Sequence, residues 1–270
     1  GGTLRQRALL DNFCWSDPVE SEKNPEGPYK LAQLVRANKA LFDYATLFGT
    51  PFISGKDSMK NDYTHQEIRI SVPQTVLISA ISVIPDVRRA VTMEFKEGGQ
   101  VIAVIGRTYP ELGGSEYFSS RGRNGNIPPR VRGPVAKRIF QRMEKAIGRG
   151  LIRSCHDISD GGLACALAES AFAGGLGAEI DLSMVPSTAI FRDDFMLFSE
   201  SQSRFVVTVA PGDREAFHHL FRGLPHAVIG RVRDDGLFLI KGLGGSQAVE
   251  TDVARLREAW QSPFKDVFSA

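Results

Sequence analysis

One stretch of the chain combines side chains that could bind a phosphate or a metal ion. Residues 156–162, HDISDGG, place a histidine, two carboxylates and a hydroxyl directly before two glycines. Leu163, Leu167 and Ala171 follow at a spacing of four, which predicts a helix that ends at the glycine pair 174–175. The polar groups would then lie at a helix N-terminus, where free N–H groups and the helix dipole favour an anion. Capping by Asp or Ser, worth about 0.5–2 kcal/mol, is the alternative, although it accounts for only one acid.

A second polar stretch, SGKDSMKND at 54–62, follows a short predicted strand at 51–54. It places a glycine, a cation, an acid and a hydroxyl at a strand end, where α/β proteins often bind ligands. It is not a P-loop, because Asp57 separates Lys56 from Ser58 and the first glycine of that motif is missing. A solvated turn accounts for the stretch equally well.

Other chemistries find little support in the residues. Cys155 and His156 are neighbours at a predicted strand end, so their side chains should point to opposite faces and form no catalytic dyad. Ser159 lacks the GxSxG elbow of serine hydrolases. The remaining histidines have no cysteine or acid at the spacing of a metal site.

The composition is that of a globular protein: 270 residues, 42% hydrophobic and 24% charged. A net charge of +2 does not suggest a nucleic-acid partner, and the basic runs 121–123 and 130–138 are interpreted as solvated faces. Three cysteines without metal spacing suit a reducing cytoplasm. Because no apolar run approaches about 18 residues, we expect a soluble, cytoplasmic protein without a membrane partner.

Periodicity predicts a layered α/β sandwich that holds these stretches in place. An apolar face over 31–45 predicts a helix closed by Gly49, and residues 86–98 look like the passage to a second domain. The segment 107–127 is predicted to be a long loop. Further helices are expected at 131–147, 215–222 and 253–260, and strands at 74–84 (buried), 99–106, 151–155, 177–182 and 204–211, with 226–232 pairing with 236–240.

Taken together, five segments are similar to one family. They are DNFCW (11–15), SGKDSMKND (54–62), LGGSEYF (112–118), HDISDGGL (156–163) and FSESQSRFVVTV (198–209). Their order and spacing resemble the second half of phosphoribosylformylglycinamidine synthase, over nearly the whole chain. The wider superfamily shares the fold but not the pair GKDSM and HDxSDGGL.

The resemblance implies an aminoimidazole ribonucleotide synthetase-like fold, an α/β (α+β) sandwich. Residues 1–88 would be an N-terminal-type domain that lacks its start, and 89–270 a complete C-terminal-type domain. The family's N-terminal domains pair to enclose nucleotide and substrate sites. With ATP, Mg²⁺ and ammonia from a glutaminase, the enzyme converts formylglycinamide ribonucleotide to formylglycinamidine ribonucleotide in purine biosynthesis.

The resemblance also implies roles for individual residues. The metal ligand would be Asp157. The nucleotide contacts would be Asp11, Gly55, Lys56, Asp57, Asp157 and Ser159, and the substrate contacts Ser58, Glu200, Ser201 and Gln202. Lys56 stands where the family's smaller form has a metal-binding asparagine; a charged lysine cannot ligate a metal, so a phosphate contact is expected.

The first half of the enzyme, which carries the family's general base, has no counterpart here. We therefore assign no catalytic residue, and we expect the chain alone to be inactive and to pair with the missing half or with a second copy of itself. Two alternatives stay open. The chain could belong to another ATP-using member of the superfamily, such as an aminoimidazole ribonucleotide synthetase, or to a noncatalytic nucleotide-binding scaffold.

Overall fold

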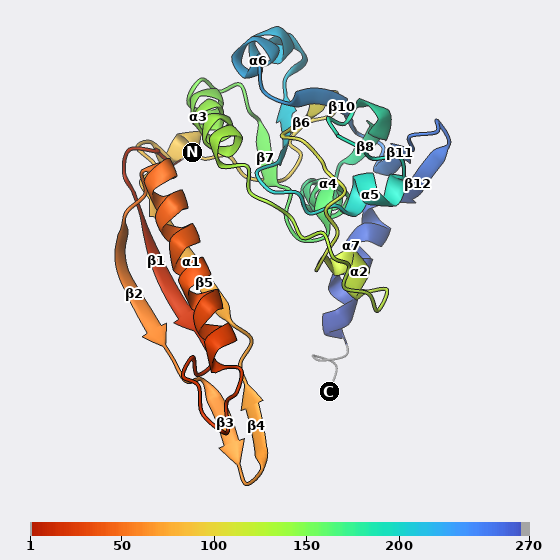
Figure 1. Ribbon diagram of the computed structural model, residues 1–270. Coiled ribbons are helices and arrows are strands. Elements are labelled where there is room, and N and C mark those ends of the chain that lie inside the picture. The colour runs from red at the N-terminus through yellow and green to blue at the C-terminus, as the bar shows by residue number, and fades with distance from the viewer. Residues whose placement is uncertain (1, 266–270) are drawn as a thin grey trace. The chain divides into compact units, whose positions relative to one another are not determined.

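The computed structural model describes residues 2–265 and divides into two compact units (Figure 1). The first unit is Gly2–Pro85, and the second begins at Asp86. The HDISDGG stretch lies in the second unit and the GKDS stretch in the first, so the two candidate stretches belong to separate units.

The second unit is built on a seven-stranded sheet in the order β12-β11-β8-β10-β6-β9-β7. Neighbouring strands are antiparallel except β8 and β11, which are parallel. Its strands are β6 (Val101–Ile105), β7 (Ser154–Asp157), β8 (Gly177–Asp181), β9 (Phe205–Val209), β10 (His226–Arg233), β11 (Leu237–Lys241) and β12 (Gln247–Asp252).

Helices cover both faces of this sheet (Figure 1). They are α2 (Glu116–Ser119), α3 (Gly133–Gly148), α4 (Gly162–Gly174), α5 (Asp193–Phe198), α6 (Arg214–Phe221) and α7 (Val253–Lys265). Three single-turn 3₁₀ helices lie at Val87–Arg89, Leu182–Met184 and Pro211–Asp213. The side chains of β6 alternate between two cores, as a strand between two helical layers requires. Ile102 and Val104 pack in the core that includes Leu163 of α4, whereas Ala103 and Ile105 pack in the core that includes Ile139 of α3.

The first unit holds a three-stranded sheet in the order β2-β1-β5, a helix and a hairpin. Its strands are β1 (Arg7–Cys14), β2 (Phe52–Ser58) and β5 (Thr75–Ser82); the hairpin is β3 (Asp62–His65) with β4 (Ile68–Ser71), and the helix is α1 (Gly27–Phe48). The helix ends as predicted, because Gly49 adopts a left-handed conformation with φ 67° and its N–H bonds to carbonyls of the last turn.

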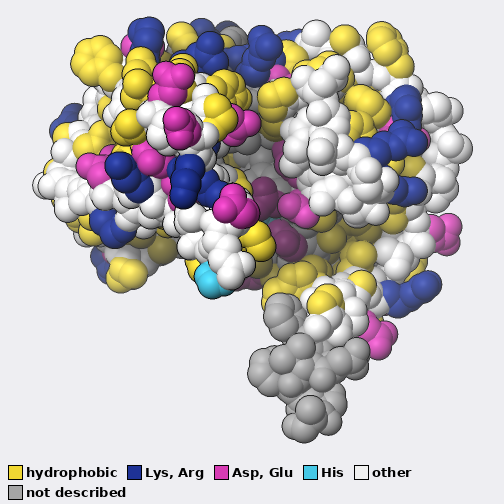
Figure 2. Space-filling view, turned by 60° about the horizontal axis from the view of Figure 1, so that its bottom comes forward, with side chains coloured by type: hydrophobic (Ala, Val, Ile, Leu, Met, Phe, Trp, Pro, Cys, Tyr) yellow, Lys and Arg dark blue, Asp and Glu magenta, His cyan; other side chains and the backbone are white. Residues whose placement is uncertain are grey.

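Much apolar surface of the first unit is open to solvent. Leu77 and Ile81 of β5 are 60% and 61% exposed, and Phe42 of α1 is 71% exposed. Hydrophobic side chains are also visible at the surface among charged ones in Figure 2. The prediction of a buried strand at 74–84 is therefore wrong about burial, because one helix and three strands do not cover the apolar positions of β5.

The prediction that 226–232 pairs with 236–240 is also wrong. Both segments are strands, but β8 lies between β10 and β11 and pairs with each of them. The strands β1, β3, β4 and β12 and the short helices α2 and α5 were not predicted; α2 lies within the loop predicted at 107–127. No helix within residues 2–265 is both long and apolar enough to cross a bilayer.

Candidate functional site

The HDISDGG stretch forms the end of β7, a tight loop and the start of α4. The helix was predicted, but the strand predicted at 151–155 lies at Ser154–Asp157, so His156 and Asp157 belong to the strand end and not to the loop. Both glycines are required by the backbone, since Gly161 has φ 73° and Gly162 has φ 68°. A Cβ on Gly162 would lie 2.7 Å from the carbonyl oxygen of Leu197, so any side chain would push against the backbone of α5. The two glycines therefore let the loop turn sharply and let α4 begin close to its neighbour.

The alternative that Asp or Ser caps α4 is wrong. The N-cap residue is Gly161, and no side chain caps it by a hydrogen bond. An anion does lie at this helix end, but it belongs to the chain itself. Oε1 of Glu200 accepts hydrogen bonds from the backbone N–H of Gly161 and of Glu116, both at 2.9 Å. The two acids of the loop are thus not needed to start the helix.

Asp157 projects from the end of β7 with its side chain 64% exposed. A hydrogen bond from His156, helped by a weaker effect of one from Ser159, lowers the pKa of Asp157 to about 2. The carboxylate is therefore ionised at neutral pH. His156 Nε2 lies 2.7 Å from Oε2 of Glu169 on α4, and its Nδ1 lies 3.4 Å from Oδ1 of Asp157. The hydrogen bond to Asp157 is the main cause that raises the pKa of His156, and the hydrogen bond to Glu169 adds to it. The histidine is thus held between two carboxylates and orients Asp157.

The described residues around this loop offer few ligands for a divalent cation. No group of three or more histidine, cysteine or acidic side chains within residues 2–265 could enclose a metal ion. Asp157 is exposed, ionised and held in place at the end of β7. One carboxylate fits Mg²⁺, which commonly takes one or two protein carboxylates and fills its shell with water and substrate phosphates.

A thiol nucleophile is not present beside this loop. Burial raises the pKa of Cys155 to about 12, and burial also raises the pKa of Cys165. Both thiols therefore stay protonated at neutral pH, when a nucleophile or metal ligand would need the thiolate.

The candidate substrate residues Glu200, Ser201 and Gln202 lie in the loop between α5 and β9. Glu200 is 8% exposed and Ser201 is fully buried. Ser201 Oγ accepts a hydrogen bond from the N–H of Tyr109 at 3.0 Å, while Glu200 holds the start of α4. Gln202 is exposed and donates to the carbonyl oxygen of Glu200 at 3.2 Å. Within this triplet, only Gln202 presents its side chain to solvent.

The sequence did not point to Arg204, whose buried side chain holds this loop by hydrogen bonds to its backbone. The residue is 1% exposed, and its guanidinium donates to the carbonyl oxygens of Ser201 and Ser199 and to Oγ1 of Thr108. Burial lowers its pKa to about 9, with Glu111 and Glu200 opposing the shift. Nothing in the spacing signals this role, because an arginine beside a strand is ordinarily interpreted as exposed.

In the first unit, the parallel pairing of β1 and β2 brings Asp11 directly beside Gly55. A Cβ on Gly55 would lie 2.0 Å from Oδ1 of Asp11, so the missing side chain makes room for this carboxylate. Because strand side chains alternate, Asp57 shares this face, whereas Lys56 and Ser58 lie on the other face. Lys56 Nζ donates a hydrogen bond to Ser58 Oγ.

The expectation that GKDS follows a strand end is wrong in detail. These residues lie within β2, which continues to Ser58 because its pairing with β1 continues there. The N–H of Trp15 also donates to the carbonyl oxygen of Ser58 at 2.8 Å. The structure thus pairs Asp11 with Gly55 and Lys56 with Ser58, and it brings Glu200 to the loop that carries Asp157.

Residues 97–241 match the family model described as AIR synthase related protein, C-terminal domain. The chain belongs to the AIR synthase related family. The matched region runs from just before β6 to the end of β11 and includes both Asp157 and Glu200.

Curated members resemble the chain beyond this C-terminal domain. The phosphoribosylformylglycinamidine synthase subunit PurL of Alkaliphilus metalliredigens is 33% identical over 94% of the chain, and that of Thermococcus sibiricus is 32% identical over 96%. These matches cover 32% and 34% of the two relatives, so the chain spans about a third of their length.

Solved AIR synthase related structures show the same fold. PurL of Thermotoga maritima, solved in complex with ATP, superposes with a TM-score of 0.62 at 19% identity, covering 93% of this chain and 38% of that one. The hydrogenase maturation protein HypE of E. coli superposes with a TM-score of 0.64 at 16% identity, covering 92% of this chain and 73% of that one. The predicted aminoimidazole ribonucleotide synthetase-like fold is confirmed.

Proposed function

We propose that the chain is part of an ATP-dependent ligase, phosphoribosylformylglycinamidine synthase. The whole enzyme would convert formylglycinamide ribonucleotide, ATP and glutamine-derived ammonia to formylglycinamidine ribonucleotide, ADP and phosphate. One structural observation carries the proposal: Asp157 is exposed and ionised beside a helix start at which Glu200 already accepts the N–H of Gly161. The 33% identity to PurL subunits over 94% of the chain supports the same function.

In this proposal Asp157 holds Mg²⁺ and Ser159 contacts the nucleotide. Bound Mg²⁺ would neutralise phosphate charge and orient the phosphates. His156 and Ser159 keep the Asp157 carboxylate ionised by hydrogen bonding, so it is ready to accept a cation. Since Glu200 already takes the N–H of Gly161, phosphate binding here depends on the cation more than on the helix end.

The first unit carries its own set of proposed contacts. Asp11, Gly55 and Asp57 line one face of the β1–β2 pair and contact nucleotide, while Lys56 contacts a phosphate from the other face. Ser58, beside Lys56, contacts substrate. Gln202 contacts substrate through its exposed amide, and Glu200 and Ser201 act by holding the loop in place.

The proposed domains are 1–88, an incomplete N-terminal-type synthetase domain, and 89–270, a C-terminal-type domain. The exposed apolar side chains of β5 and α1 support a partner that covers them. This partner is the missing half of the synthetase or a second copy of the chain, and a glutaminase domain or subunit supplies ammonia. No catalytic residue is assigned, so the chain alone should release no ADP above background from ATP, ammonia and the formamide substrate.

The decisive experiment is thermal unfolding of the 270-residue chain with ADP. Mg²⁺ and ADP together should raise the melting temperature, whereas ADP with EDTA should not. Asp157→Asn should abolish the rise, and Asp160→Asn, which changes the neighbouring exposed acid, should keep it. The proposal fails if Mg-ADP gives no rise, or if Asp157→Asn leaves the rise intact.

Mg-ADP binding and ATP hydrolysis, both measured on the full-length parent, separate the alternatives. Substrate-stimulated ATP hydrolysis by the full-length parent with formylglycinamide ribonucleotide supports the synthase. A response to a different ribonucleotide indicates another ATP-using superfamily member. Mg-ADP binding with no turnover in the full-length parent indicates a noncatalytic scaffold.

A further inference from the structure

Glu169 of α4 is a charged residue to which the proposed function gives no role. Its Oε2 lies 2.7 Å from Nε2 of His156, the residue next to Asp157, although the two partners are 13 positions apart in the chain. Within residues 2–265, this is the one hydrogen bond of the Glu169 side chain. The His156 and Glu169 side chains are 15% and 35% exposed. The contact therefore ties the middle of α4 to the end of β7.

The place of Glu169 on the helix does not account for an acid there. Glu169 is the eighth residue of Gly162–Gly174, well beyond the first turn, where a carboxylate favours the helix dipole. The helix is already held by Leu163, Leu167 and Ala171, which are buried in the core. A partly exposed ion pair adds only about 0–1 kcal/mol to stability. Stability alone is thus a weak reason for this contact.

The contact fixes how the His156 ring is turned. The backbone of His156 pairs with Val206 of β9, so its main chain is held in the sheet. A carboxylate only accepts hydrogen bonds, so Nε2 of His156 must carry the hydrogen that Glu169 accepts. Nδ1 then faces Oδ1 of Asp157 at 3.4 Å. With the main chain held by β9 and the far nitrogen held by α4, the ring cannot swing away from Asp157.

Glu169 acts through His156 and not on a cation directly. No group of three histidine, cysteine or acidic side chains within residues 2–265 could hold a metal ion, and this includes His156, Asp157 and Glu169. The imidazole separates the two carboxylates, because each meets a different ring nitrogen. The Asp157 side chain is 64% exposed, so it can contact His156 through Oδ1 and a cation from solvent at the same time. Groups that orient a metal ligand in this way are worth about 10–100-fold in metal affinity.

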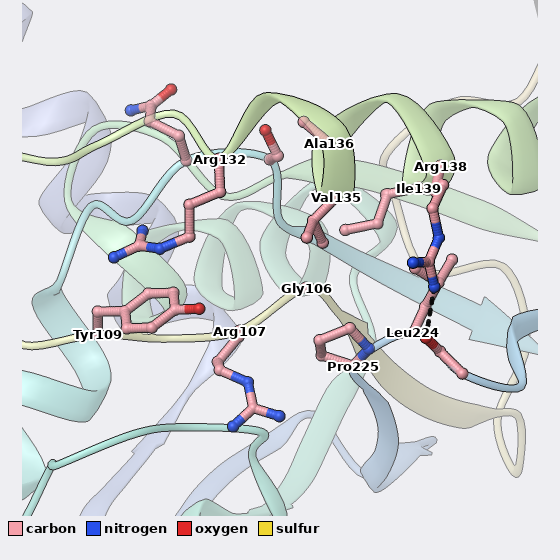
Figure 3. A pocket seen from close by; sticks show the side chains of 13 residues that line it. Gly106, Arg107, Tyr109, Arg132, Val135, Ala136, Arg138, Ile139, Leu224 and Pro225 are labelled. Atoms are coloured by element: carbon pink, nitrogen blue, oxygen red, sulfur yellow. Dashed lines mark hydrogen bonds between the residues drawn. The ribbon is translucent and has the colours of Figure 1, made fainter.

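The cavity in Figure 3 is separate from this line of contacts. It has a volume of about 200 Å³ and lies against Val135 and Ile139 of α3, with Gln202 also in its lining. Its described lining residues do not include His156, Asp157 or Glu169. A change at Glu169 should therefore alter cation binding and leave the candidate substrate contact of Gln202 unchanged.

We propose that Glu169 is a positioning residue for the metal site: it fixes His156, and His156 in turn holds Asp157 in the orientation that receives Mg²⁺ with its nucleotide. This role rests on the proposed function, because it takes Asp157 as the Mg²⁺ ligand. Glu169 itself contacts neither metal, nucleotide nor substrate. Its effect should appear in the Mg²⁺ concentration that nucleotide binding requires.

Thermal unfolding of the 270-residue chain at a fixed ADP concentration, titrated with Mg²⁺, measures this requirement. Glu169→Ala should raise the Mg²⁺ concentration for half of the rise in melting temperature about tenfold or more. Glu169→Gln should stay close to the parent chain, because its carbonyl oxygen can accept the Nε2–H of His156. Glu179→Ala is the matched control and should leave the requirement unchanged. It removes a carboxylate that accepts from Arg231 at 2.9 Å, and three strands lie between β8 and β7.

A measurement without metal or nucleotide tests the contact itself. Nitrogen-15 NMR of the histidine rings, with His156 assigned by its loss in His156→Gln, should show an Nε2–H in the parent chain that exchanges slowly with water. Glu169→Ala should lose this signal, and Glu169→Gln should keep it. A parent chain without the slowly exchanging Nε2–H overturns the contact on which the role depends.

The outcomes separate this role from the proposed function. If Mg-ADP raises the melting temperature of the parent chain and Glu169→Ala needs no more Mg²⁺ than the parent, the role of Glu169 is overturned and the proposed function stands. Equal impairment of Glu169→Gln and Glu169→Ala, or of Glu179→Ala and Glu169→Ala, also overturns it. If the NMR signal is present but Mg-ADP gives no rise in the parent chain, the proposed function fails, and the role of Glu169 fails with it.

Discussion

Replacing Glu200 with alanine should destabilise the second unit by about 3 kcal/mol. The carboxylate is 8% exposed, and its Oε1 accepts two backbone N–H groups, from Gly161 and Glu116, each at 2.9 Å. Hydrogen bonds to a charged acceptor contribute about 1.5–3 kcal/mol each, and truncation leaves both donors without their partner. Water that enters the space left by the side chain recovers part of this loss. The result should be a midpoint about 6–12 °C lower, at roughly 2–4 °C per kcal/mol.

Glu200→Gln is the matched control, because both hydrogen bonds end on the same oxygen. A glutamine carbonyl oxygen can accept both N–H groups, so only the charge is lost, at about 1 kcal/mol. Differential scanning calorimetry measures both variants, and amide hydrogen exchange at Gly161 should accelerate only in Glu200→Ala. Equal destabilisation by both variants would show that charge matters more than the two bonds. A midpoint for Glu200→Ala within 2 °C (about 1 kcal/mol) of the parent chain would refute the reasoning.

Three further outcomes follow from the same loop. Gly162→Ala should lower the thermal midpoint, because φ is 68° and a Cβ would lie 2.7 Å from the Leu197 carbonyl oxygen; the same change at exposed Gly212, where no atom lies within 4 Å, should have little effect. The pKa of His156 is raised in the folded chain, so its stabilisation is present below its unfolded pKa of about 6.5 and is lost as pH rises through the folded value. The midpoint difference between the parent chain and His156→Gln should therefore be larger at pH 6 than at pH 9, and a constant difference would contradict this. With its pKa raised to about 12, Cys155 should resist iodoacetamide at pH 8 in the folded chain and react in urea, as peptide mapping would show.

Local pattern predicted most elements of the second unit. The spacing of Leu163, Leu167 and Ala171 predicts α4, and all three side chains are buried in the core. Strand order could not be predicted in the same way. Strands β10 and β11 are consecutive in the chain, yet β8 pairs between them, and this choice depends on packing with α4 and α7 on the sheet.

Burial in the first unit was harder to predict than its elements. The β-branched run of β5 predicts a core strand. Its burial, however, depends on what covers the strand and not on the strand's own residues. The candidate site shows the same limit. The motif around Asp157 was visible, whereas the contact of Glu200 with its helix start comes from the loop after α5, whose approach is set by tertiary structure.

The position of Glu200 changes how the acid loop can function. A helix start preceded by two acids looks like a phosphate site, but here the chain's own carboxylate already takes the N–H of Gly161, and Ser159 O takes that of Gly162. The loop therefore presents an exposed, ionised Asp157 in place of free N–H groups, and a bare phosphate would meet negative charge there. A divalent cation resolves this conflict, because it bridges the carboxylate and the phosphates. It follows that nucleotide binding at this loop should require Mg²⁺.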